Sequence, residues 1–255
     1  MKDSLKRQRN EALAIPDGSS PEVKQRVSAA DWNAISAALD ANGFATMTGL
    51  LDPEGCSAII RLYPEDHKFR SHIHMARHGF GRGEYKYFAY PLPDAIGALR
   101  TALYPPLAAI ANRWNEALGE QSRFPLRHAD FLKRCHNAGQ TRPTPLLLKY
   151  EASDYNCLHQ DLYGEHVFPL QVAIVLSAPE EDFTGGEFVL TEQRPRMQSR
   201  ASVIPLRRGD AVIFAVHHRP ARGARGSYRV NLRHGVSAVR SGNRYTLGII
   251  FHDAK

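Results

Sequence analysis

The pattern of apolar and polar positions predicts helices in the first half of the chain. Apolar side chains recur at helical spacing after Ser28 and Asp31, either of which can cap a helix, and the pattern stops at Gly43. Residues 44–51 have the composition of a strand, and Pro53 suits the first turn of a second helix.

A longer helical block follows from Asp94 to Leu118. Pro105 and Pro106 lack the backbone N–H that a helix interior needs, so this block is predicted to break into two helices. A further helix is predicted from Leu126 to Cys135, whereas residues 1–27 are polar and predict an arm or a short helix.

The periodicity changes to that of strands after Pro145. Short apolar runs separated by Gly, Asp and Pro turns are typical of a sandwich or barrel. The predicted strands cover residues 146–150, 168–176, 187–190, 203–206, 211–214, 230–236 and 245–251. Three parts are therefore expected: the arm (1–27), a helical region packed on the core (28–139) and a β core (140–255).

The segment from Met75 to Leu92 interleaves arginines and aromatic residues with three glycines. One interpretation is a loop or lid, around residues 77–90, that binds a substrate. The alternative is a β-hairpin whose aromatic side chains belong to the core.

Composition restricts the class of protein. The chain has 255 residues and a formal net charge of +7, and no apolar run approaches the roughly 20 residues that span a bilayer. The charged start, Met1 to Asn10, has no apolar secretory core. The three cysteines are an odd number and are expected to be free thiols. We expect a cytoplasmic protein with no membrane partner.

Arginine recurs between Arg194 and Arg244, where Asp210 is the single acidic residue. This run is either a solvated surface of a basic protein or a rim that faces an anion such as nucleic acid. Arginine suits bidentate contacts with carboxylate or phosphate.

The sequence His159-Gln160-Asp161 and a distant His234 indicate a metal site. Alternate side chains of a strand share one face, so His159 and Asp161 are predicted to point the same way, and His234 arrives from a later strand. Two imidazoles and one carboxylate suit iron(II) and leave three positions open, although zinc accepts the same ligands.

Other residues compete for these roles. His217 and His218 are alternatives for the third ligand, but they precede a predicted turn at Arg219-Pro220 and suit an active-site rim better. Cys157 would share a strand face with His159, and we interpret it as a small packing residue rather than a ligand. His166 and His252 are interpreted as structural, and Asp253 as a salt-bridge partner at most.

The C-terminal half resembles the 2-oxoglutarate- and iron(II)-dependent dioxygenases, close to the prolyl 4-hydroxylase-like branch, over roughly residues 140–253. The wider chain looks like a bacterial family described as oxygenases acting on damaged nucleic acid. The segments that carry these resemblances are His78–Gly83, His159–Asp161, Phe183–Glu187, Arg208–Phe214, His234–Arg244 and His252–Asp253.

The resemblance implies a mainly β fold with a helical N-terminal half, in which helices buttress a double-stranded β-helix, or jelly roll. It also implies that His159, Asp161 and His234 hold Fe(II). Arg244 would bind the distal carboxylate of 2-oxoglutarate, and Tyr150 and Gln171 are further candidates for contacts with this cosubstrate.

The implied reaction consumes O2, converts 2-oxoglutarate to succinate and CO2, and hydroxylates a C–H bond of the substrate. Hydroxylation of an N-methyl group leads to demethylation, so an alkylated base in nucleic acid is one substrate class. A protein side chain such as prolyl is the alternative. A non-catalytic jelly roll that binds metal for structure or sensing is a third hypothesis.

Overall fold

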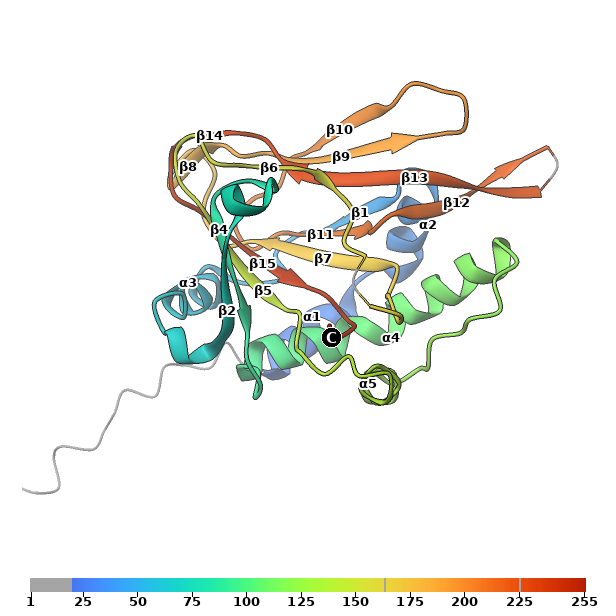
Figure 1. Ribbon diagram of the computed structural model, residues 1–255, viewed down its shortest axis with the longest axis horizontal. Coiled ribbons are helices and arrows are strands. Elements are labelled where there is room, and N and C mark those ends of the chain that lie inside the picture. The colour runs from blue at the N-terminus through green and yellow to red at the C-terminus, as the bar shows by residue number, and fades with distance from the viewer. Residues whose placement is uncertain (1–19, 163, 225) are drawn as a thin grey trace, which may run out of the picture.

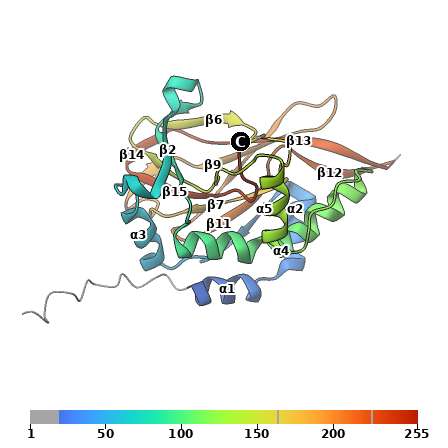
Figure 2. The ribbon, with the colours of Figure 1, turned by 60° about the horizontal axis from the view of Figure 1, so that its bottom comes forward.

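A computed structural model describes residues 20–162, 164–224 and 226–255 in three layers (Figure 1). A smaller sheet lies on one side of a larger sheet, and α1, α4 and α5 lie on the other side of the larger sheet (Figure 2). The helices are α1 (Ser20–Ala29), α2 (Trp32–Asn42), α3 (Pro53–Arg61), α4 (Asp94–Ala117) and α5 (His128–Asn137), with short 3-10 helices η1 (Asp66–Lys68) and η2 (Met75–His78).

The larger sheet has seven strands in the order β1-β11-β7-β15-β5-β4-β2. The smaller sheet follows the order β10-β9-β13-β6-β3, with β12 paired to β13, and β14 pairs with β8 separately. In chain order the strands are β1 (Phe44–Met47), β2 (Phe69–His74), β3 (Gly81–Arg82), β4 (Glu84–Phe88), β5 (Leu146–Tyr150), β6 (Tyr155–His159), β7 (Leu170–Val175), β8 (Phe183–Gly185), β9 (Phe188–Gln193), β10 (Arg200–Ile204), β11 (Ala211–Ala215), β12 (His218–Gly223), β13 (Gly226–Val236), β14 (Val239–Gly242) and β15 (Arg244–Ile249). These pairings are antiparallel, so the predicted mainly β fold is confirmed.

The ends of α2 follow from the sequence as predicted. The Asp31 carboxylate accepts hydrogen bonds from the backbone N–H groups of Asn33 and Ala34, and thereby caps the first turn. Gly43 ends the helix in the left-handed conformation, with its N–H bonded to the Leu39 carbonyl.

The predicted break in the central helix is wrong, because α4 runs without interruption from Asp94 to Ala117. Pro105 is exposed and Pro106 is partly exposed, whereas Leu103 and Tyr104 on the other side of the helix are fully buried. Packing of the buried side therefore outweighs the backbone hydrogen bonds that the prolines remove.

The N-terminal half is helical only in part. β1 pairs with β11 and β4 pairs with β5 in the larger sheet, and β3 pairs with β6 in the smaller one. α1 begins within the segment 1–27 that is predicted to be a polar arm or short helix and ends two residues beyond it, at Ala29, and residues 1–19 lie outside the described residues.

The turn predicted at Arg219-Pro220 is also wrong, because both residues lie in β12. β12 pairs with β13 alone, and such an edge strand tolerates a proline that donates no hydrogen bond. Arg219 is buried and forms an ion pair with Glu192 at 2.9 Å, so it is a structural residue.

No helix within the described ranges is both long and apolar enough to cross a membrane.

A buried charged pair joins α4 to the C-terminal segment. Arg100 Nη2 lies 2.7 Å from Asp253 Oδ1, and both side chains are almost fully buried. The Tyr90 hydroxyl and His136 Nε2 also bond to Asp253, so the prediction of a salt-bridge partner is confirmed. Burial opposes ionisation of Asp253, but the Arg100 charge and these hydrogen bonds outweigh it and lower its pKa.

We expect Asp253→Asn to lower the free energy of unfolding at pH 7 by about 3–5 kcal/mol, because it leaves the buried Arg100 without a counter-charge. Urea unfolding measures this loss. The pKa of Asp253 is lower in the folded chain than the unfolded value of 3.8, so its contribution is present above that pH and is lost as the pH falls below it. The difference in free energy of unfolding between the wild type and Asp253→Asn should therefore shrink in acid.

Asp130→Asn, which breaks an exposed pair with Arg127, is the control and should change stability far less. Equal losses from the two substitutions would contradict the prediction.

Candidate metal centre

The pairing of β13 with β6 brings the predicted ligands together. His159 is the last residue of β6, Asp161 follows two residues later, and His234 lies near the end of β13. In the antiparallel register His234 is directly opposite His159, and the two ring centroids are 4.2 Å apart.

The three side chains converge on one point. His159 Nε2 lies 3.4 Å from Asp161 Oδ1, and His234 Nε2 lies 3.5 Å from Asp161 Oδ2. One ligand atom from each residue lies within 4.8 Å of the others, so a single ion can be shared by all three.

Hydrogen bonds and packing fix the orientation of the ligands. His159 Nδ1 lies 2.7 Å from the Cys157 carbonyl, which can only accept, so Nδ1 carries the proton and Nε2 is free to bind metal. The ring of His234 packs against Phe188 and Phe214. Gln160, between His159 and Asp161, donates a 2.7 Å hydrogen bond to the Leu232 carbonyl on β13.

Gly235 allows β13 and β6 to approach closely beside the ligands. A Cβ atom at this position would lie only 2.7 Å from the carbonyl oxygen of Asn156. The glycine next to His234 therefore has a physical role in the site.

The charges of the site favour a metal. Burial opposes the ionised form of Asp161, but hydrogen bonds from His159 and His234 outweigh it and hold its pKa well below the usual value. Burial lowers the pKa of His234. A deprotonated carboxylate beside a buried imidazole with a low proton affinity is ready for a divalent cation.

Arg244 lies at the start of β15, directly opposite Tyr150 of β5. Its side chain is 1% exposed, and its Nη1 donates a 2.6 Å hydrogen bond to the Thr246 hydroxyl. No carboxylate in the described ranges forms an ion pair with it, and its Nε has no hydrogen-bond partner there. Burial lowers the pKa of this guanidinium. A buried arginine without an anion is costly, so this position calls for an anionic ligand.

Gly186 provides the space for the Arg244 side chain. It has a φ of +61°, and a Cβ atom there would lie 2.8 Å from Arg244 Cδ. Gly186, directly after β8, is therefore also a wall of the arginine pocket.

A cavity of about 350 Å³ connects Arg244 with the three ligands. Tyr150 and Gln171 line it, and the buried Tyr150 hydroxyl and Gln171 Nε2 have no hydrogen-bond partner in the part of the chain that the structure describes, although the Asn156 side chain neighbours the hydroxyl. Leu146, Leu148, Tyr85 and Tyr87 supply apolar walls. The cavity thus combines a charged end, uncommitted polar groups and an apolar lining.

The competing histidines do not reach this site. The side chains of His217 and His218 contact each other, and His218 Nε2 lies 3.8 Å from Glu120. His252 is buried, and its Nδ1 accepts a hydrogen bond from the Phe168 N–H, which fits a structural role.

The cysteines are free, as predicted. Cys157 lines the cavity without joining the ligand set. Its side chain is exposed, so it is not the packing residue that we expected.

Two of the side chains that line this cavity are exposed and apolar. Phe80 is 47% exposed and Leu158 is 45% exposed, and Phe80 stacks on His78 at a centroid distance of 5.3 Å. Within the 75–92 segment Phe88 belongs to the core, as the hairpin interpretation expected, whereas Phe80, Tyr85 and Tyr87 line the cavity, and their binding of a substrate stays a prediction.

Residues 83–254 match the model of a family described as "Oxygenase, catalysing oxidative methylation of damaged DNA". The chain belongs to this oxygenase family. The enzyme class predicted from the sequence, an oxidoreductase, is thereby confirmed. Two uncharacterized proteins of Mycobacterium tuberculosis, MT2286 and Rv2227, are each 53% identical to this oxygenase over 167 residues, which cover 66% of its chain and 72% of theirs.

Solved structures show the same fold at low sequence identity. A prolyl-4-hydroxylase from Pseudomonas putida has a TM-score of 0.53 and 13% identity, with 88% of this oxygenase and 99% of that chain covered. A Trichoplax adhaerens prolyl hydroxylase in complex with a hypoxia-inducible-factor peptide fragment has a TM-score of 0.52 and 16% identity, with 90% of this oxygenase and 91% of that chain covered. A Burkholderia pseudomallei oxidoreductase of the 2OG-Fe(II) oxygenase family has a TM-score of 0.50 and 14% identity, with 89% of this oxygenase and 93% of that chain covered. The fold of this oxygenase is therefore that of the 2-oxoglutarate- and iron(II)-dependent enzymes.

Two residues that position the site were missed in the sequence. Thr246 orients Arg244, and Gln160 ties the ligand segment to β13. The strand alternation from Arg244 to Thr246 could have identified the first. The second depends on a contact 72 residues away in the chain, for which the sequence has no local signal.

Proposed function

We propose that this oxygenase binds Fe(II) through His159, Asp161 and His234 and uses 2-oxoglutarate to hydroxylate a C–H bond of its substrate. The observation that carries the proposal is the buried Arg244, which has no counter-ion in the described ranges and shares a cavity with the three ligands. In this proposal the two facing sheets form the double-stranded β-helix, residues 140–255 are the catalytic core and residues 28–139 complete its walls.

The residues fit these groups chemically. Two imidazoles and one carboxylate form the ligand set that leaves three positions of iron(II) open. The guanidinium of Arg244 matches the distal carboxylate of 2-oxoglutarate, and Tyr150 and Gln171 offer further hydrogen bonds to this cosubstrate. When bound, iron and 2-oxoglutarate supply the activation of O2, with succinate and CO2 as the products of the cosubstrate.

The protein contributes placement and the exclusion of water. The Cys157 carbonyl holds His159 in the tautomer that binds metal, and Phe188 and Phe214 prevent the His234 ring from turning. The apolar side chains of Leu146 and Leu148 keep the cavity dry near the reacting groups.

We further propose that the substrate is an alkylated base in nucleic acid, consistent with the family description. The cavity is at the small end of ligand sites, so it suits a base or a side chain that a larger molecule presents. Tyr85 and Tyr87 offer aromatic walls for an unstacked base. The exposed arginines that form no ion pair with another described residue include Arg77, Arg82, Arg196, Arg222 and Arg233, and these side chains can meet phosphates.

Replacement of any metal ligand should abolish turnover. We expect His159→Ala, Asp161→Ala and His234→Ala each to stop the formation of succinate that depends on iron and 2-oxoglutarate, because two ligands cannot hold the ion in place. Circular dichroism checks that each variant is folded, and His67→Ala, an exposed histidine far along the chain, is the control. Succinate formation at the wild-type rate in any folded ligand variant would overturn the proposal, and also separates an enzyme from a non-catalytic metal-binding module.

Replacement of Arg244 tests the cosubstrate pocket. Arg244→Ala should raise the 2-oxoglutarate concentration for half-maximal succinate formation by roughly 10- to 100-fold, because a charge-assisted contact is lost. Arg244→Lys should raise this concentration by less than Arg244→Ala does, since lysine keeps the charge but not the bidentate geometry. Arg240→Ala, an exposed arginine of β14, is the matched control. An unaltered half-saturation in Arg244→Ala would reject this role.

The substrate is tested by release of formaldehyde from methylated single- and double-stranded oligonucleotides. We expect release from these oligonucleotides and none from unmethylated ones, and binding should weaken steeply with salt because arginines meet phosphates. Hydroxylation of prolyl peptides without release of formaldehyde would instead favour a protein hydroxylase. Salt-insensitive binding would count against nucleic acid as the substrate.

A further inference from the structure

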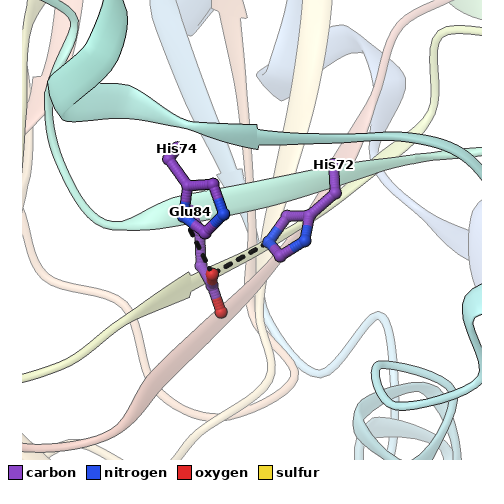
Figure 3. Close-up of side chains that lie close together, drawn as sticks. All are labelled: His72, His74 and Glu84. Carbon is purple, nitrogen blue, oxygen red and sulfur yellow. Dashed lines mark hydrogen bonds and ion pairs between the residues drawn. The ribbon is translucent and has the colours of Figure 1, made fainter.

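A second group of metal-ligating side chains lies on the hairpin of β2 and β4 (Figure 3), and none of its three residues lines the cavity. His72 and His74 alternate along β2, so both point to one face of this edge strand. In the register of the hairpin, Glu84 on β4 is directly opposite His74 and diagonal to His72. The strand pairing therefore brings two imidazoles and one carboxylate together.

The distances between these three side chains suit hydrogen bonds, and they also suit a shared metal ion. Glu84 Oε2 lies 2.8 Å from His72 Nε2 and 3.4 Å from His74 Nδ1, and the two imidazole centroids are 4.4 Å apart (Figure 3). Ligand atoms around a tetrahedral zinc ion are separated by about 3.3 Å, given bonds of about 2.0–2.1 Å. Only small rotations of His72 and Glu84 would therefore admit the ion.

The group is open to solvent on a concave surface. A hollow of about 410 Å³ is lined by His74 and Glu84 and also by Lys149, Glu151 and Asp154. Lys149 Nζ lies 3.9 Å from Glu84 Oε1, but it is closer to Glu151, at 2.6 Å. Arg82 also lines the hollow, so the three carboxylates of Glu84, Glu151 and Asp154 face two cations and leave one negative charge in excess to attract a metal ion.

We propose that His72, His74 and Glu84 bind a divalent metal ion of the zinc type, distinct from the ion at His159, Asp161 and His234. Two imidazoles and one carboxylate are a ligand set that zinc accepts, and the hollow leaves its fourth position open to water.

The ion would join the edge strand to the wall of the active site. Tyr85 and Tyr87 alternate with Glu84 on β4 and line the cavity on the other face of the strand. In the sheet β2 pairs with β4 alone, and its register shifts between Phe69 and Ser71. A metal bridge between β2 and β4 therefore stabilises the strand that carries both tyrosines.

Zinc titration of the metal-free full chain by calorimetry tests the proposal. The wild-type protein should bind two equivalents, because zinc also accepts the ligands of the active site. The variant His72→Ala/His74→Ala should bind one, and Glu84→Gln should weaken the second equivalent by more than the roughly 10- to 100-fold typical for loss of an outer-shell partner. His159→Ala/His234→Ala should keep the equivalent that the hairpin binds.

The control is His67→Ala, which removes an exposed histidine just before β2 and should leave both equivalents in place. Failure of His159→Ala/His234→Ala to bind one equivalent, or binding of the same number of equivalents by the wild type and by His72→Ala/His74→Ala, would overturn the proposal. Zinc should also slow hydrogen exchange of the β2 amides in the wild type and not in the double variant, and equal exchange in the two proteins would overturn the bridging role. These readouts do not depend on turnover, so they stand apart from the test of the oxygenase reaction.

Discussion

The register between β13 and β6 is the constraint on which the site depends. It places His234 opposite His159, and a shift by one residue would turn the side chain of His234 to the other face of the sheet. Two features hold this register close to the ligands. Gly235 lets the backbones approach, and the Gln160 side chain bonds to the Leu232 carbonyl across the strands. The ligand geometry is therefore a property of strand pairing rather than of loops.

Two buried charges of opposite sign lie at different ends of the cavity. The deprotonated Asp161 lies with the imidazoles, whereas the guanidinium of Arg244 is buried beside Tyr150 on the larger sheet. An isolated buried charge destabilises a fold, and each of these charges faces the space between the sheets, where a ligand of opposite sign can compensate it. A divalent cation compensates the charge of Asp161, and a dicarboxylate compensates the charge of Arg244. The two buried charges therefore point to the same pair of ligands.

The sequence was sufficient where one short-range rule decides the structure. Asp31 and Gly43 mark the ends of α2, and His159 and Asp161 lie close together as their spacing predicted, although Asp161 lies just beyond the end of β6. It was insufficient where packing decides. The buried side of α4 keeps the helix continuous past Pro105, and the edge position of β12 accommodates Pro220. β2 was not predicted, because its mostly polar sequence does not alternate between apolar and polar residues. Pairing with β4 determines that this segment is a strand.

The hairpin of β2 and β4 shows how one strand can serve two sites. Alternation along β4 sends Tyr85 and Tyr87 into the cavity, while Glu84 points to the histidines of β2 and Lys86 lies over the ring of Tyr63. A force that fixes the outer side chains must also fix the inner ones, because both are attached to the same pleated backbone. The position of the aromatic walls therefore depends on how firmly β2 is held at the sheet edge. β2 pairs with one neighbouring strand alone, and an ion bound by the ligand set on its outer face would add a further link between β2 and β4.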